Sequence, residues 1–412
     1  MTDYSVESGA AVKLGRIEGE LKVGPNVTIM AESDQRVVVT GGAYFSGSVT
    51  IECDFECESM KVSGQGYGSG GNVEVKGNLT VHKSADVAAS LKVAGDFKAD
   101  NVDVGGHLEA KSLVSKLTRI GGHMKIDGGL EAEKVDVGGH MSVLGIVKLG
   151  DLYVGGHAEL GGGAIVGRIE LRGHLSSTSR LEFGELESFG HIRLPGGSTG
   201  RKIQVLGKVE FLGDAICKDM QIKGVAKVFG DYSGEDVEVS GKFEVLGSMS
   251  ITKKVEIYGV ADVGKEVNCE SLTVCGKLRA DSILADVDAE VGGKVETSRG
   301  LKAKSILVRK GACVEGPLVG QQVEIGKMSS AMSSWGGSLW PSTGRTSVED
   351  VYGNKVRIGR CSRARLVFAE DAEMDEESFA EKVTYTNDLK LPASYRLGTP
   401  PLKTSMLPEP PI

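Results

Sequence analysis

Proline and aromatic residues are scarce in this sequence: proline accounts for 10 of 412 residues and aromatic residues for 5%. With 40% hydrophobic residues, the chain is too apolar for a disordered segment and has no collagen-like G-X-Y register. No stretch approaches the about 18 apolar residues of a membrane helix. The first residues, MTDYSVESGAAVKLG, lack the charged and apolar regions of a secretory signal, so we expect a cytoplasmic protein.

Cysteine is also sparse and follows no metal-binding spacing. The seven cysteines lie at positions 53, 57, 217, 269, 275, 313 and 361. Cys53 and Cys57 form a C-x₃-C without a second pair, and Cys269 and Cys275 lie six residues apart, so neither pair predicts a zinc site. The odd number and the scatter are typical of reduced thiols.

A basic block and a phosphate-binding loop are both missing. The net charge is −8, which disfavours a nucleic-acid partner. The segment GQGYGSGG lacks the GK[ST] of a phosphate loop, so no cofactor is expected.

Glycine, by contrast, is abundant, with 59 residues, and it repeats. VDVGGHLEA at 102–110 returns as VDVGGHMSV at 135–143. Six histidines follow at intervals of 16 or 17 residues: His107, His123, His140, His157, His174 and His191. The glycine before each histidine continues downstream in the same phase: Gly106, Gly122, Gly139, Gly156, Gly173, Gly190, Gly207, Gly224, Gly241, Gly259, Gly276 and Gly293.

The period of about 17 residues is too short for helical repeats. Around each glycine, apolar and polar residues alternate, as in Val102, Val104 and Leu108 against Asp103 and Glu109. Such alternation is typical of strands. We therefore predict an all-β, single-stranded β-solenoid with three faces and about 17 residues per coil.

The alternation gives the glycine column the inward parity and the histidine column the outward parity. We interpret the glycines as a structural column, required either for a positive φ or because facing strands leave no room for a Cβ atom. The histidines should stack at about 5 Å, the spacing of adjacent strands.

The period also divides the chain. We expect a flexible N-terminus over 1–11, a β-helix over 12–327, and a Ser/Gly/Trp loop over 328–347. Terminal strands and a capping helix within the acidic segment 369–382 should occupy 348–382, followed by an extended proline-rich tail over 383–412.

Phrases such as VEVSGKFEV at 237–245, in short coils ahead of a proline-rich tail, resemble the bactofilins, the polymer-forming cytoskeletal proteins. The resemblance covers about residues 12–360. It implies a right-handed β-helix that assembles end to end into filaments without nucleotide, often near membranes. This chain departs from the family in its much longer core and its long C-terminal segment, which would block one end.

The histidine column allows three interpretations. It is a solvated polar ladder, a Zn²⁺ or Ni²⁺ site of neighbouring imidazoles, or a pH-sensitive surface. We favour the polar ladder, because no cysteine or carboxylate recurs beside these histidines and lysine replaces them at 208, 242, 277 and 294. That lysine stripe would solubilise the protein or meet an anionic partner or lipid surface.

Trp335 and Trp340 in the Ser/Gly-rich segment are candidate docking residues. The best overall interpretation is a non-enzymatic scaffold whose partner is a second copy of itself, bound through coil ends, with a membrane or protein partner reached through the termini. The alternatives are a capped binding module that does not polymerise, a hexapeptide-repeat enzyme and a polysaccharide-acting β-helix enzyme. The enzymes are disfavoured, because the histidines share one register and nearly all coils lack the long side loops of a substrate groove.

Overall fold

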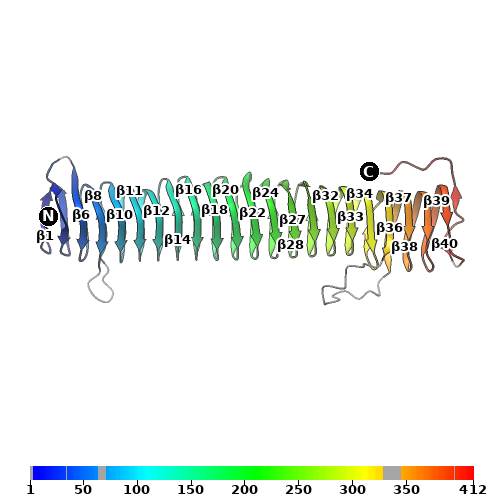
Figure 1. Cartoon of the computed structure of the whole chain (residues 1–412), viewed down its shortest axis with the longest axis horizontal. Coiled ribbons are helices and arrows are strands. Elements are labelled where there is room, and N and C mark those ends of the chain that lie inside the picture. Colours follow the sequence, from blue (N-terminus) through cyan, green and yellow to red (C-terminus); the bar gives the residue numbers. More distant parts are fainter. Residues whose placement is uncertain (1–2, 34, 64–70, 328–344, 394) are drawn as a thin grey trace. The chain divides into compact units, whose positions relative to one another are not determined.

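The computed structural model describes residues 3–33, 35–63, 71–327, 345–393 and 395–412. The chain divides into two compact units, Met1–Arg201 and Lys202–Ile412. Parallel strands form solenoid coils in both units, about 22 coils in all with about 17 residues each, and the described residues contain no helix (Figure 1). The predicted all-β solenoid is thus confirmed.

In the first unit the strands are β1 (Tyr4–Val6), β2 (Ala11–Leu14), β3 (Arg16–Ile17), β4 (Leu21–Val23), β5 (Val27–Ala31), β6 (Arg36–Phe45), β7 (Val49–Ile51), β8 (Asp54–Val62), β9 (Val73–Val75), β10 (Leu79–Val87), β11 (Leu91–Val104), β12 (His107–Ile120), β13 (His123–Ile126), β14 (Leu130–Val137), β15 (His140–Val143), β16 (Val147–Val154), β17 (His157–Leu160), β18 (Gly163–Leu171), β19 (His174–Ser177), β20 (Leu181–Ser188) and β21 (His191–Leu194). The chain passes into the second unit within β22 (Ser198–Val205).

In the second unit the strands are β23 (Lys208–Phe211), β24 (Ala215–Ile222), β25 (Val225–Val228), β26 (Tyr232–Gly234), β27 (Asp236–Val239), β28 (Lys242–Val245), β29 (Met249–Ile251), β30 (Lys254–Ile257), β31 (Val260–Val263), β32 (Glu266–Val274), β33 (Lys277–Val291), β34 (Lys294–Arg309), β35 (Cys313–Glu315), β36 (Leu318–Lys327), β37 (Thr346–Ile358), β38 (Ser362–Met374), β39 (Phe379–Lys390), β40 (Arg396–Leu397) and β41 (Leu402–Lys403).

One coil shows how the sequence forms three faces. In the coil built from β15 and β16, alternate residues turn inward and are at most 3% exposed. These inward residues come in three pairs, one for each face: Met141 and Val143, Val147 and Leu149, Leu152 and Val154. Burial of each such side chain contributes on the order of 1.5–3 kcal/mol.

Coils stack because each inward side chain lies on its equivalent in the next coil. Leu108 pairs with Met124, and Met124 with Met141, in parallel register. The backbone hydrogen bonds of each coil therefore go to its neighbours, which leaves polar groups satisfied around a narrow apolar core.

The boundaries of the solenoid differ from the predicted ones. The expected flexible segment 1–11 contains β1, which pairs with β4. Beyond residue 327, β37, β38 and β39 add further coils in parallel register. Part of the expected tail 383–412 is also strand, because β39 continues to Lys390 and β40 and β41 pair with it.

The capping helix expected within 369–382 was wrong, since β38 and β39 occupy that segment. Its apolar residues Ala372 and Met374 pair with Val356 and Ile358 of the preceding coil, and this burial outweighs local helix propensity. The acidic side chains point outward and form ion pairs with arginines of the neighbouring coil: Asp375 with Arg357, Glu376 with Arg360, and Glu381 with Arg363. Among the described residues, no helix is long and apolar enough to cross a membrane.

Candidate functional site

The most regular group of polar side chains in the first unit is the column of six histidines. Strand pairing places the histidines directly opposite one another in the order His107, His123, His140, His157, His174 and His191. Successive ring centroids are 4.7, 4.8, 6.0, 4.8 and 5.0 Å apart. We call this column the histidine ladder.

The rings differ in orientation along the ladder. His107 and His123 are stacked with an interplanar angle of 1°, whereas His174 and His191 meet edge to face at 81°. The side chains of His107, His123 and His140 are exposed, and the last three are half-buried. The ladder thus presents a nearly continuous row of imidazole rings.

The glycine before each histidine positions the ladder. The amide of His140 donates to the carbonyl of Gly122 at 3.1 Å, and that of His157 donates to Gly139 at 3.2 Å. The inter-coil hydrogen bonds therefore continue through the corner, which holds successive histidines at one strand spacing.

Close packing explains the glycine column in both units. A Cβ atom on Gly122 would lie 2.6 Å from the carbonyl oxygen of Gly106, and equivalent contacts recur along the column. In the first unit the column comprises Gly106, Gly122, Gly139, Gly156, Gly173 and Gly190, and in the second Gly207, Gly224, Gly241, Gly259, Gly276 and Gly293. None of these residues has a positive φ. Of the two reasons that we considered, lack of space is therefore the one that applies.

The surroundings of His174 disfavour its protonated form. Burial, and then the neighbouring rings of His157 and His191, lower the pKa of His174. Arg193 acts in the same direction, while Glu159 opposes it. Glu159 also lies 3.2 Å from Nε2 of His157. Neutral imidazoles accept and donate hydrogen bonds, and they are the form that ligates metals.

The described residues contain no group of three or more His, Cys, Asp or Glu arranged to hold a metal ion. A metal on the ladder would thus have two neighbouring imidazoles as protein ligands, and metal binding stays one of the less favoured interpretations given above. The arrangement itself offers a row of hydrogen-bonding groups at a spacing of about 4.8 Å.

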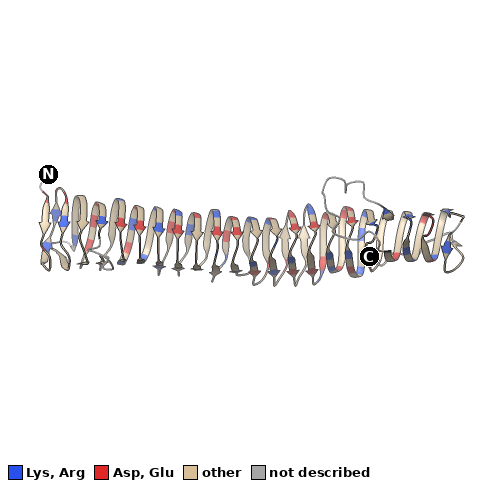
Figure 2. Ribbon diagram, turned by 90° about the horizontal axis from the view of Figure 1, so that it is seen from below, with Lys and Arg blue, Asp and Glu red and all other residues tan. Residues whose placement is uncertain are grey.

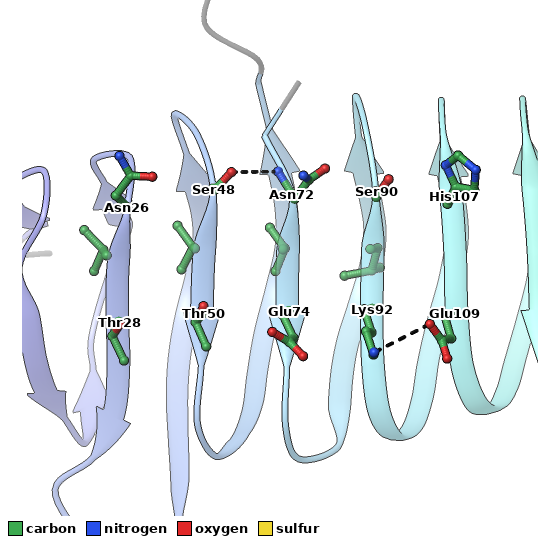
Figure 3. Close-up of a pocket in the computed structure, with 14 residues that line it drawn as sticks. Asn26, Thr28, Ser48, Thr50, Asn72, Glu74, Ser90, Lys92, His107 and Glu109 are labelled. Carbon is green, nitrogen blue, oxygen red and sulfur yellow. Dashed lines mark hydrogen bonds and ion pairs between the residues drawn. The ribbon is translucent and has the colours of Figure 1, made fainter. Parts of the chain in front are cut away.

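The ladder continues toward the N-terminus as a column of smaller polar residues, which the sequence period did not reveal. Asn26, Ser48, Asn72 and Ser90 precede His107 along the edge of a shallow groove (Figure 3). A second column of Thr28, Thr50, Glu74, Lys92 and Glu109 lines the other side. The amide of Asn72 donates to Ser48 Oγ at 3.4 Å, and Lys92 Nζ lies 3.7 Å from Glu109. This column is recognised from the strand register. The sequence period does not reveal it, because the early coils are longer and irregular.

Lysines and valines share the equivalent column of the second unit. Lys208, Val225 and Lys242 occupy successive positions. Each lysine forms an ion pair with a glutamate two residues along its own strand, 2.6 Å for Lys208 and Glu210 and 3.6 Å for Lys242 and Glu244.

Further along, Lys294 forms the same pairing with Glu296 at 2.8 Å, and Lys277 of the preceding coil lies 2.8 Å from the same carboxylate. Basic and acidic side chains are consequently interspersed on neighbouring coils (Figure 2). This pairing supports the solubilising interpretation of the lysine stripe, because little uncompensated positive charge remains to attract an anionic surface.

The remaining candidate residues are cysteines and two tryptophans, and the cysteines among the described residues form no metal-binding cluster. Cys53 and Cys57 are buried, and burial raises the pKa of Cys57 to about 12. Cys269 is buried with a pKa of about 12 for the same reason, while Cys275 is half-buried. Trp335 and Trp340 lie outside the described residues.

Scans against protein-family models, curated proteins and solved structures each returned no match.

Proposed function

We propose that this protein is a non-enzymatic, bactofilin-like scaffold that self-associates through the ends of its coils. The observation that carries the proposal is the open edge of the first coil. Its strands β1, β2 and β3 pair with β4, β5 and β6 of the following coils, and their other edges carry no described strand. An unpaired edge is a template for a strand of another molecule.

The backbone groups of this edge can be assigned individually. Thr28 donates to the carbonyl of Ala10, and Glu32 to the carbonyl of Leu14. Because successive residues of a strand point to opposite sides, the N–H and C=O of Lys13 face away from the second coil. They are available to a second copy.

The positions of the groups with strongly shifted pKa values are also consistent with a structural role. Burial raises the pKa of Cys217 to about 12 and raises that of Tyr232 well above its usual value. The Tyr232 hydroxyl donates to the Cys217 carbonyl at 2.9 Å inside the core. Catalytic groups with shifted pKa values usually line a cleft, whereas these groups contribute to packing.

The test is electron microscopy of the purified full chain over a range of concentrations. We expect filaments one solenoid wide that lengthen with concentration. Lys13→Pro removes the outward amide and should shorten the filaments, while the matched control Lys13→Ala keeps that amide and should leave them unchanged. Particles of constant size at every concentration, or equal filament lengths for both variants, would contradict the proposal.

A capped binding module is the second candidate, and one observation favours it. β40 and β41 pair with β39 at Phe379–Ala380 and Thr384–Tyr385, which occupies part of the edge at the C-terminal end. In that case the polar groove beside His107 would be the binding surface, and particles of constant size in the same experiment would support it.

A further inference from the structure

One outward column of the second unit contains two buried residues, although outward positions of a coil are normally exposed. Strand pairing places Lys302, Val319, Tyr352, Phe368 and Thr384 opposite one another on successive coils. The residue before each of them turns into the core. Nevertheless Val319 is only 9% exposed and Thr384 only 5%. Another part of the chain must therefore cover the column, which we call the strap groove.

The C-terminal segment provides that cover. β41 pairs with Thr384 and Tyr385, and the chain then reverses direction. Nine residues later, the carbonyl of Ile412 accepts a hydrogen bond from Lys302 Nζ at 3.3 Å. A Cβ atom on Gly300 would lie 3.4 Å from Ile412 Cγ2. The segment after β41, residues 404–412, thus returns along the column, and the C mark lies beside β34 rather than beside β40 (Figure 1).

The length of the segment fits this path. β41 lies one coil beyond Thr384, so the path to Lys302 covers five coil steps. At about 4.8 Å each these need about 24 Å, while nine residues of extended chain at about 3.1 Å reach about 28 Å. Between its two attached ends the segment crosses the four coils that carry Thr384, Phe368, Tyr352 and Val319. We call residues 404–412 the strap.

The chemistry of the two surfaces is complementary. The strap sequence TSMLPEPPI contains three prolines, which favour an extended backbone without internal hydrogen bonds. In the strap groove Tyr352 and Phe368 are stacked with centroids 4.8 Å apart, and burial raises the pKa of Tyr352. Pro408, Pro410 and Pro411 are exposed, so they act by keeping the segment extended, which reduces the entropy lost on binding, while Leu407 and Ile412 are its half-buried apolar side chains.

Few side chains of the strap are even partly buried. Leu407 and Ile412 are half-buried, while Met406 is 75% exposed. Segments with few buried contacts open locally at a small free-energy cost. Local opening of the strap therefore exposes the groove to a segment of the same chemistry.

We propose that the strap groove is a docking surface for the strap of a second copy, so that residues 404–412 exchange between chains and link neighbouring molecules. This inference rests on the self-association proposed above and adds a second, lateral contact to it. The strap of another copy makes the same contacts as the chain's own strap, which is the condition for domain exchange. The intramolecular strap competes at a high effective concentration, so exchange should increase with protein concentration.

The first test uses fluorescence anisotropy with a labelled, amidated peptide of residues 402–412. The full-length double variant Leu407→Asp/Ile412→Asp weakens its own strap and should bind the peptide at least tenfold more tightly than the wild-type chain does. Adding Val319→Lys, on the outward side of the coil, should abolish binding of the peptide. If that variant fails to fold, Phe368→Lys replaces it and should have the same effect. Equal affinity for all variants, or no binding to any, would contradict the proposal that the strap groove binds this segment.

The second test mixes two full-length variants and measures their association by sedimentation. Val319→Lys has a strap but no groove, whereas Leu407→Asp/Ile412→Asp has a groove but no strap. With Lys13→Pro in both chains, the mixture should form a heterodimer that neither variant forms alone. Absence of the heterodimer would contradict the proposal that the strap exchanges between chains. Peptide binding does not depend on end-to-end stacking, so failure of the strap groove and failure of filament formation are distinguished.

Discussion

A Cβ atom on Gly156 would lie 2.5 Å from the carbonyl oxygen of Gly139 in the preceding coil. That oxygen accepts the amide hydrogen of His157, so it cannot retreat without weakening the inter-coil hydrogen bond. The column glycine is therefore required by the spacing of the coils, whereas the histidine beside it points outward.

We expect Gly156→Val to lower the free energy of unfolding by about 2–3 kcal/mol or more, because the added atoms force the coils apart. The neighbouring change His157→Ala should cost less than about 0.5 kcal/mol, as an outward substitution. Urea unfolding of the two variants measures the difference. Equal midpoints would show that the register of glycine and histidine has been assigned incorrectly.

The histidine ladder should make stability depend on pH. Because the pKa of His174 is lowered in the folded state by burial and by His157 and His191, the unfolded chain binds more protons near its ordinary pKa of 6.5. The free energy of unfolding should therefore decrease as pH falls through 6.5 toward 5, by at most about 1.4 kcal/mol per pH unit for one proton.

His174→Asn should reduce this slope, since it removes the titrating group and its repulsion with neighbours. Ser176→Ala, on the same strand, is the control and should retain the wild-type slope. Thermal unfolding between pH 5 and 8 measures the effect. An identical slope for wild type and His174→Asn would exclude the ladder as a pH-sensitive surface at this position.

The sequence predicts the coil and the ladder because both depend on a local period. His107 to His191 hold one phase, and each inward pair such as Met141 and Val143 lies within a single short strand. The later coils were predicted only as terminal strands over 348–382, because residues 328–344 interrupt that phase. A signal was nevertheless present, since Val351, Val367 and Val383 recur at 16-residue intervals.

Contacts between coils could not be predicted from the period alone. The ion pair of Lys277 with Glu296 depends on which outward columns become neighbours, which only the strand register determines. The strap is an extreme case, because Lys302 and Ile412 are separated by 110 residues. Nothing in the composition of a proline-rich tail indicates which distant column it will cover.

The Lys–Glu ladder of the second unit should stabilise the fold modestly and in an acid-sensitive manner. Hydrogen bonds from Lys277 and Lys294 lower the pKa of Glu296 to about 2. Its contribution is present above pH 4.5 and is lost as pH falls toward 2. Because both lysines are partly exposed, Glu296→Gln should cost less than about 1 kcal/mol at pH 7. Chemical denaturation by urea at low and high salt measures it, and a cost that salt does not reduce would contradict an ion-pair origin.

Thiol labelling tests both whether the core cysteines stay buried and whether the C-x₃-C pair is a zinc site. Because burial raises the pKa of Cys57 to about 12, its thiol stays protonated at pH 8 and is a poor nucleophile and a poor zinc ligand. Mass spectrometry after brief iodoacetamide treatment should find Cys57, Cys217 and Cys269 unmodified in the folded chain. All seven cysteines should react in urea. Rapid labelling of Cys57 without denaturant, or its protection by added Zn²⁺, would mean that β8 leaves the core readily and that the pair is a site rather than packing.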